Sequence, residues 1–398
     1  METAQAARAV LLVLPLFLLG LLIIPGRWRW PLAAGFGLLG AACLSAFMPI
    51  GILSYLSSFS TMAMIYAILA LGLNSQWGLS GQVNFGIAGF FAIGAFSSAL
   101  LTTDMPAGAL AAYSQQVFGL GWPYIAGVIG AGLISALVGF LVSVPVLRLR
   151  ADFLAIATLG IAEIIRLILQ NERWLANGPQ PLRGIPQPGL CLFKAPRCSW
   201  LPEWIAPWLA PLGPRDYTFF YLLLTALVLA VLYWAIERIS RAPWGRVQRA
   251  IRDDERAAAM YGKPVTRYRV EAFVIGSFIM GIGGAVYAHH MIAIDYSHFN
   301  PLFATFLVWV MLMLGGSGNN KGAILGAFAI WGVWVGTETL VGQLSSQLQS
   351  IMPGLVSRSV YLRWMLVAIM LAAIVLYRPQ GIIRERKRVS DFMARDRD

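Results

Sequence analysis

Apolar residues are concentrated in eleven stretches along the chain, separated by shorter polar stretches. Most of the stretches approach the roughly 20 residues that an α-helix needs to cross the hydrocarbon core of a bilayer. Only helices and closed barrels satisfy all backbone hydrogen bonds in lipid, so the pattern predicts an all-α, polytopic helical bundle. We expect about 8 to 11 membrane segments, some of them short or broken. The stretches are Arg8–Pro25, Pro31–Ile52, Leu53–Asn74, Gln82–Leu101, Pro123–Leu147, Asp152–Gln170, Thr218–Glu237, Tyr268–His290, Leu302–Leu314, Gly322–Val341 and Tyr361–Tyr377.

Composition and charge agree with a membrane protein. The 398 residues are 58% hydrophobic and 12% charged, with a formal net charge of +12. If every stretch crosses, 21 of the 30 Lys and Arg residues lie on one side, which the positive-inside rule makes cytoplasmic. This distribution explains the charge without a nucleic-acid partner. It predicts one transmembrane domain over 1–398, an extracytoplasmic loop at 171–217, a cytoplasmic loop at 239–267 and a basic cytoplasmic tail at 379–398.

The long polar stretch Arg241–Pro264 stands apart from the other loops, because its spacing is compatible with a helix. Pro243 suits a first helical turn, and Gly262 suits the left-handed residue after a helix. We therefore predict one helix over Pro243–Gly262. Spacings of three and four place on one of its faces Val247, Ala250, Ile251, Asp254, Ala257, Ala258 and Tyr261.

Within this stretch Glu255, Ala257, Ala258 and Gly262 read E-x-A-A-x-x-x-G. The motif resembles the cytoplasmic coupling loop of ABC importer permeases, in which a helix docks into a groove of the ATP-hydrolysing subunit. The alternative is an amphipathic connector that lies against the inner membrane surface. The resemblance implies a coupling set of Trp244, Gly245, Arg249, Asp254, Glu255, Ala257, Ala258 and Gly262.

Two apolar regions, Leu71–Phe96 and Leu314–Phe328, are unusually rich in Gly and contain polar residues. Interrupted segments in both halves of a transporter are a sequence indication of the central pathway. Ordinary packing of helices through small residues is the alternative. The pathway interpretation selects Gln82, Asn84, Gly86, Glu163, Arg166 and Asn319.

Glu163 and Arg166 lie three positions apart within one predicted helix, so they can pair on the same face. Either charge alone would be costly in hydrocarbon. The pair can line a pathway, or it can be a satisfied pair that holds helices together. We expect Glu271, near the inner end of its helix, to meet Arg267 or the predicted coupling loop.

Six ordered matches resemble the branched-chain amino-acid ABC permease family. They are ALGLN with SGQVNFGIAGFFAIGAF at Ala70–Phe96, Ile156–Asn171, NGPQPLRGIP at Asn177–Pro186, the coupling segment at Arg241–Glu271, LGGSGNNKGAILGA at Leu314–Ala327 and YRPQGI at Tyr377–Ile382. The last match and the length are similar to the longer, M-type member of the permease pair. The chain departs from the family pattern at Ile87, Pro181 and Arg183, which affects the choice of solute rather than the class.

The resemblance implies a multi-pass protein of the bacterial inner membrane with a cytoplasmic C-terminus. It also implies a second, H-type permease subunit, two ABC ATPase subunits that bind ATP and Mg, an extracytoplasmic solute-binding protein, and surrounding membrane lipid. The expected solutes are branched-chain or related amino acids. Urea, short amides or another small organic solute are alternatives within the family, and an ion-driven secondary transporter is a remote one.

The remaining motifs indicate no chemistry in this chain itself. Gly315–Gly322 lacks the spacing of a phosphate-binding loop, so we expect no ATP binding, no catalytic residues and no enzyme activity here. The three histidines, His289, His290 and His298, have no ligand cluster around them, and we interpret them as interfacial residues rather than a metal site. Cys191 and Cys198 lie in the predicted outer loop and form either a disulfide or two free thiols.

Overall fold

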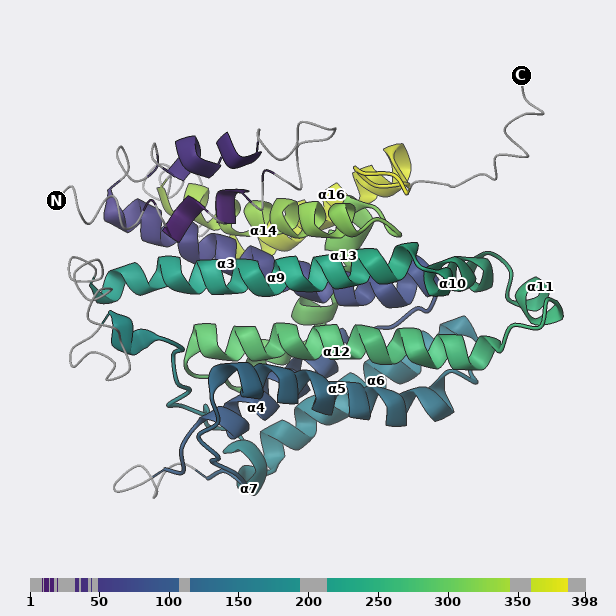
Figure 1. The fold of residues 1–398 in the computed structure, drawn as a ribbon, viewed down its shortest axis with the longest axis horizontal. Helices are drawn as coiled ribbons and strands as arrows, with labels where there is room; N and C mark the ends of the chain where they lie inside the picture. Colours follow the sequence, from purple (N-terminus) through teal and green to yellow (C-terminus); the bar gives the residue numbers. More distant parts are fainter. Residues whose placement is uncertain are drawn as a thin grey trace.

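The computed structural model describes residues 49–106, 115–193, 213–343 and 359–385, with scattered positions between 9 and 44. The predicted stretch 8–25 and the tail 379–398 lie mostly outside these residues, and the predicted stretch 31–52 is described only in part. The fold is a bundle of long helices, several of which run along the longest axis (Figure 1). They are α3 (Ile50–Leu73), α4 (Ile87–Thr102), α5 (Tyr124–Val146), α6 (Ala151–Asn171), α9 (Tyr217–Arg241), α12 (Val265–Met291), α13 (Pro301–Gly315), α14 (Asn320–Gln343) and α16 (Ser359–Tyr377).

This architecture confirms the predicted polytopic helical protein. Five of the described helices are long and apolar enough to cross a membrane, at 50–78, 124–146, 214–241, 265–291 and 320–341. The apolar helices at 87–102, 303–315 and 361–377 are shorter. No β-strand occurs in the described ranges, which contain only isolated bridges.

Helix α12 lies at the centre of the bundle, and its glycines bring it into backbone contact with α4. A Cβ added to Gly94 would lie 2.1 Å from the carbonyl oxygen of Gly281, and one added to Gly284 would lie 2.2 Å from that of Phe91. Both distances are far below van der Waals contact. Small residues therefore set the separation of these two helices, as is common in membrane bundles.

Both glycine-rich regions are interrupted, as predicted, but the helix boundaries differ from the prediction. After α3 the chain continues as a π-helical turn, η1 (Asn74–Gly78), and residues 81–86 are not helical, so the predicted span at 82–101 starts only at Ile87. Residues 74–86 are called the first break. Residues 316–319, between α13 and α14, form the second break. The boundary predicted between residues 52 and 53 is also wrong, because α3 begins after Pro49.

The helix predicted over 243–262 is two helices, α10 (Pro243–Asp253) and α11 (Glu255–Met260). Asp254 between them is extended (φ −154°, ψ 103°), and its carboxylate caps α11 by accepting from the backbone N–H groups of Arg256 and Ala257 at 2.9 and 3.0 Å. The predicted continuous face is therefore wrong. Ile251 and Ala258 are buried, whereas the side chain of Tyr261 is 85% exposed.

Candidate functional site

The polar end formed by α10 and α11 is the first part of the candidate site, and it lies at one end of the long axis (Figure 1). Gly245 allows the sharp approach of α10 to α9, since a Cβ there would lie 2.2 Å from the Ser240 carbonyl oxygen. Trp244 Nε1 donates to Glu271 Oε2 at 2.8 Å, and Arg267 Nε donates to Glu271 Oε1 at 2.8 Å. Glu271 thus meets both partners that the sequence suggested, and it fixes the start of α10 to α12.

Helix α11 is held at its base and exposed at its tip. Glu255 pairs with Arg269 of α12 at 3.2 Å. Ala258 is buried and Ala257 is half-buried, while Met260 is 86% exposed. Gly262 has a φ of +73° with nothing within 4 Å of an added Cβ, which confirms the predicted left-handed turn.

The two breaks, far apart in sequence, meet through buried amides. Asn74 Nδ2 donates to Asn320 Oδ1 at 2.8 Å, and the N–H of Gly318 donates to Asn74 Oδ1 at 2.8 Å. Asn320 Nδ2 continues the chain of bonds to Glu237 Oε2 at 2.7 Å. The sequence analysis selected none of these three residues as a site residue, and no local spacing connects their positions.

Three predicted pathway residues lie within the first break and are buried. Asn84 Nδ2 donates to Gln76 Oε1 at 2.7 Å, and the N–H of Gly86 donates to Asn84 Oδ1 at 2.6 Å. Gln82 Nε2 donates to the Arg269 carbonyl at 2.9 Å. The bonds that the structure shows for these residues are thus made within this chain, and Gln82 Oε1 is buried without a hydrogen-bond partner among the described residues. Gln76, which also donates to the Phe273 carbonyl at 2.8 Å, was missed by the sequence analysis.

The first break is also braced by aromatic rings. Trp309 Nε1 donates to the Asn84 carbonyl at 3.0 Å, and its ring lies 4.8 Å from that of Phe85 in a stacked geometry. Trp77 also packs against Trp309, with 4.6 Å between the two ring centroids. Helix α13 therefore holds the irregular backbone in place.

The other predicted pathway residues lie elsewhere. Arg166 Nε donates to Glu163 Oε2 at 2.9 Å, which confirms the predicted pair on α6. The Glu163 side chain is 40% exposed and that of Arg166 is 19% exposed. Among the described residues, neither forms a hydrogen bond with Gln82, Asn84 or Asn319. Asn319 instead donates to the Arg384 carbonyl at 3.1 Å.

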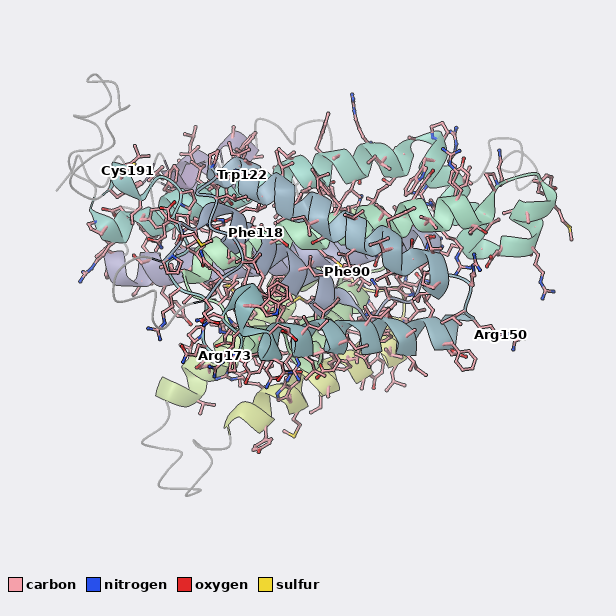
Figure 2. The ribbon with its side chains drawn as sticks, turned by 90° about the horizontal axis from the view of Figure 1, so that it is seen from below. Phe90, Phe118, Trp122, Arg150, Arg173 and Cys191 are labelled. Atoms are coloured by element: carbon pink, nitrogen blue, oxygen red, sulfur yellow. The ribbon has the colours of Figure 1, made fainter. Side chains whose placement is uncertain are left out.

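The end of the molecule opposite α10 carries the predicted outer loop. Figure 2 shows Arg173 and Cys191 at one end and Arg150, just before α6, at the other. Cys191 is disulfide-bonded, while Cys198 lies outside the described residues, so their pairing stays a prediction. The two loop regions therefore lie at opposite ends of the helices.

The interpretation of the histidines as interfacial is wrong for His289. This residue is fully buried, with Ser98 Oγ 3.0 Å from Nε2 and the Pro186 carbonyl oxygen 2.7 Å from Nδ1. It therefore joins α12 to α4 and to the segment after α7 (Arg173–Ala176). Within the described ranges, no group of three or more His, Cys, Asp or Glu residues could hold a metal ion.

Comparison with known proteins gives a consistent set of relatives. A family model described as "Branched-chain amino acid transport system / permease component" matches residues 55–377. The chain is 30% identical to the high-affinity branched-chain amino acid transport system permease protein LivM of Salmonella typhimurium, over 92% of this chain and 74% of that one. It is 31% identical to LivM of Escherichia coli, over 81% and 69% of the two chains.

A more distant match is the permease protein LivH of Escherichia coli, which is 23% identical over 68% of this chain and 80% of that one. LivH and LivM of that organism carry the same system name, high-affinity branched-chain amino acid transport system. No solved structure matches the chain.

Proposed function

This chain belongs to the family of permease components of branched-chain amino acid transport systems, and we propose that it is the membrane permease subunit of an ATP-driven importer of branched-chain amino acids. The names of its relatives support the solute class. Its multi-pass helical fold supports a position in the inner membrane.

The coupling role is supported by the polar end of the molecule that α10 and α11 form. It combines a helix, α10, that is tied to α12 through Trp244 and Glu271 with a second helix, α11, whose tip is exposed and whose small residue Ala257 is half-buried. Small side chains allow another protein surface to approach closely. We propose that two ATPase subunits, which bind ATP and Mg, dock here and at the equivalent loop of a second, LivH-like permease subunit.

The same geometry supports an orientation. Residues 378–385 lie beside α10, because Glu385 pairs with Arg252 at 2.9 Å. If α10 faces the ATPases, the C-terminal segment is cytoplasmic and the region of Cys191 faces outward. A solute-binding protein would dock over that outer region.

The transport cycle follows from these placements. Closure of the ATPases on ATP would displace α10, and this displacement would shift the helix bundle between inward-open and outward-open states. A bound nucleotide or solute changes the populations only through its different affinity for the two states. The broken segments, where Gln82, Asn84 and Gly86 lie, are the proposed place of the change, with Glu163 and Arg166 as a second candidate on α6.

Uptake by reconstituted vesicles tests this proposal. The chain is incorporated with its candidate partners, ATP is enclosed in the vesicles, and labelled leucine is added outside with the binding protein. Leucine uptake that requires hydrolysable ATP is the expected result, and a non-hydrolysable ATP analogue is the control. Labelled urea runs in parallel, because ATP-dependent urea uptake without leucine uptake would overturn the solute. Uptake driven by an ion gradient alone would overturn the class.

A further inference from the structure

The segment 378–385, which follows α16, is built into the second break. The N–H groups of Ile382 and Ile383 donate to the carbonyls of Leu314 and Gly315 at 2.9 and 3.0 Å. A Cβ added to Gly381 would lie 2.4 Å from Gly316 Cα, so the two backbones are in direct contact. This C-terminal segment is therefore part of the bundle rather than a free tail.

Glu385, the last described residue, lies between the second break and α10. Its Oε2 is 2.9 Å from Arg252 Nη2, and its Oε1 is 3.3 Å from Arg249 Nε. A Cβ added to Gly318 would lie 2.7 Å from the carboxylate carbon of Glu385. Arg249 and Arg252 are three apart on α10 and share a face, so the carboxylate also offsets the repulsion between their charges.

Arg252 extends the contact to the first break. Its Nη1 donates to the carbonyl oxygen of Gly78, and a Cβ at Gly81 would lie 3.0 Å from its Cγ. The two breaks touch each other at the same place, since a Cβ at Gly78 would lie 2.6 Å from the backbone nitrogen of Gly318. Glu385 and Arg252 thus close a ring of contacts that runs from α10 through both breaks.

We infer that Glu385 is a positioning residue, which holds Arg249 and Arg252 of α10 against the second break so that a movement of α10 reaches both breaks together. Two distant sites are coupled when both shift the equilibrium of the same structural element between its two states. Without the carboxylate, α10 keeps its bond to Gly78 but loses its ionic contact with the C-terminal segment that is packed against the second break. The inference rests on the proposed function, because it explains how a movement of the ATPases at α10 is transmitted to the transmembrane helices.

The first test measures leucine uptake and phosphate release in the same vesicles. Glu385→Gln keeps the shape and removes the charge. We expect the leucine transported per ATP hydrolysed to fall about five-fold, the factor that corresponds to loss of roughly 1 kcal/mol. Glu385→Asp, which keeps the charge, should retain most of the ratio. Arg384→Gln changes the exposed neighbour in the same segment and should leave the ratio unchanged. An unchanged ratio in Glu385→Gln, or an equal fall in Arg384→Gln, overturns the inference.

The second test needs neither solute nor ATP. Spin labels on cysteines introduced at positions 246 and 384, in a background with Cys43→Ala, Cys191→Ala and Cys198→Ala, report the distance from α10 to the C-terminal segment in the purified full chain. We expect one narrow distance distribution with Glu385 and a broad one with Glu385→Gln. A distance distribution that is the same with and without Glu385→Gln overturns the inference, whether or not the vesicles take up leucine. Absence of leucine uptake with the unaltered chain would overturn the proposed function, and this result is distinguishable from the distance result.

Discussion

The side-chain amide of Asn74 donates to the side-chain oxygen of Asn320 over 2.8 Å, and this bond joins two positions that are 246 residues apart. The oxygen of the same amide accepts from the N–H of Gly318 at 2.8 Å. Asn74 is fully buried and acts as donor and acceptor at once. A carboxylate lacks the donor and an aliphatic side chain lacks both donor and acceptor, so neither can replace the amide at this position.

Asn74→Asp should therefore lower the stability of the bundle. The change keeps the shape but removes the donor and leaves Asn320 Oδ1 buried without this partner. A buried polar group without a partner costs about 1–3 kcal/mol. Thermal unfolding of the detergent-purified protein measures the effect as a lower midpoint. The control is Asn171→Asp, because Asn171 is exposed and its side chain donates to the Leu167 carbonyl in the same helix rather than to another part of the described chain. Equal unfolding midpoints for the two variants would contradict a stabilising role for the hydrogen bonds between Asn74, Asn320 and Gly318.

Gly94→Ala should separate α4 from α12. The added methyl group would overlap the Gly281 carbonyl oxygen, which is backbone and cannot rotate away. Overpacking of this kind costs about 1–3 kcal/mol. The matched control is Gly160→Ala on α6, where an added Cβ has nothing within 4 Å. We expect a lower thermal midpoint for the first variant and an equal or higher one for the second, because Ala is the better helix former. A lower midpoint for Gly160→Ala alone would contradict this packing.

Features that depend on local spacing were predicted well from the sequence. Within the described residues between 49 and 385 the apolar stretches form helices, the glycine-rich regions are interrupted, Glu163 pairs with Arg166 and Gly262 takes a left-handed turn. The error at α10 and α11 is also local in origin. Asp254 was assigned to a helical face by its spacing, although Asp is a strong N-cap residue that favours a new helix start. Tertiary contacts to α12 then favour the two short helices over one.

The connections between distant segments could not be predicted in the same way. Nothing in the spacing of Glu385 indicates Arg252, and nothing near Asn74 indicates Asn320. Such contacts depend on how the whole bundle packs. The polarity of Gln82 and Asn84 suggested a pathway, but polarity alone does not distinguish a pathway residue from one whose bonds brace an irregular backbone. The structure gives both residues bonds within the chain, and a transport role for them stays a prediction.

Gly262→Val should impair coupling without preventing insertion. The residue has a φ of +73°, and the left-handed region costs L-residues roughly 1–2 kcal/mol, more for β-branched ones. Space is not limiting there, so the effect is purely conformational. We expect normal membrane insertion and reduced solute-stimulated ATPase activity in the assembled transporter. Gly262→Asn is the control, since Asn tolerates this conformation. Full stimulation of the ATPase activity in the Gly262→Val variant would contradict a role of this turn in coupling.

The disulfide prediction can be tested by mass spectrometry. Cys191 is disulfide-bonded, and Cys198 is the other cysteine of the predicted outer loop. Alkylation before and after reduction should show two additional modified thiols after reduction. Proteolysis without reduction should yield a peptide pair that contains residues 191 and 198. A peptide pair that joins residue 191 to residue 43 would contradict the prediction.

Ala257→Arg should block the docking of the ATPases. Ala257 is half-buried at the start of α11, next to the exposed tip that carries Met260 and Tyr261. A long cationic side chain at this position would keep a partner surface from close approach, and it would add a positive charge next to that of Arg256. Co-purification of the ATPases with the tagged permease measures docking, and we expect it to be lost while the permease still inserts. Gln180→Arg, an exposed change in the segment at the opposite end, should leave co-purification intact. If the ATPases are retained with Ala257→Arg, they bind elsewhere, and α10 and α11 would then be a connector at the inner membrane surface.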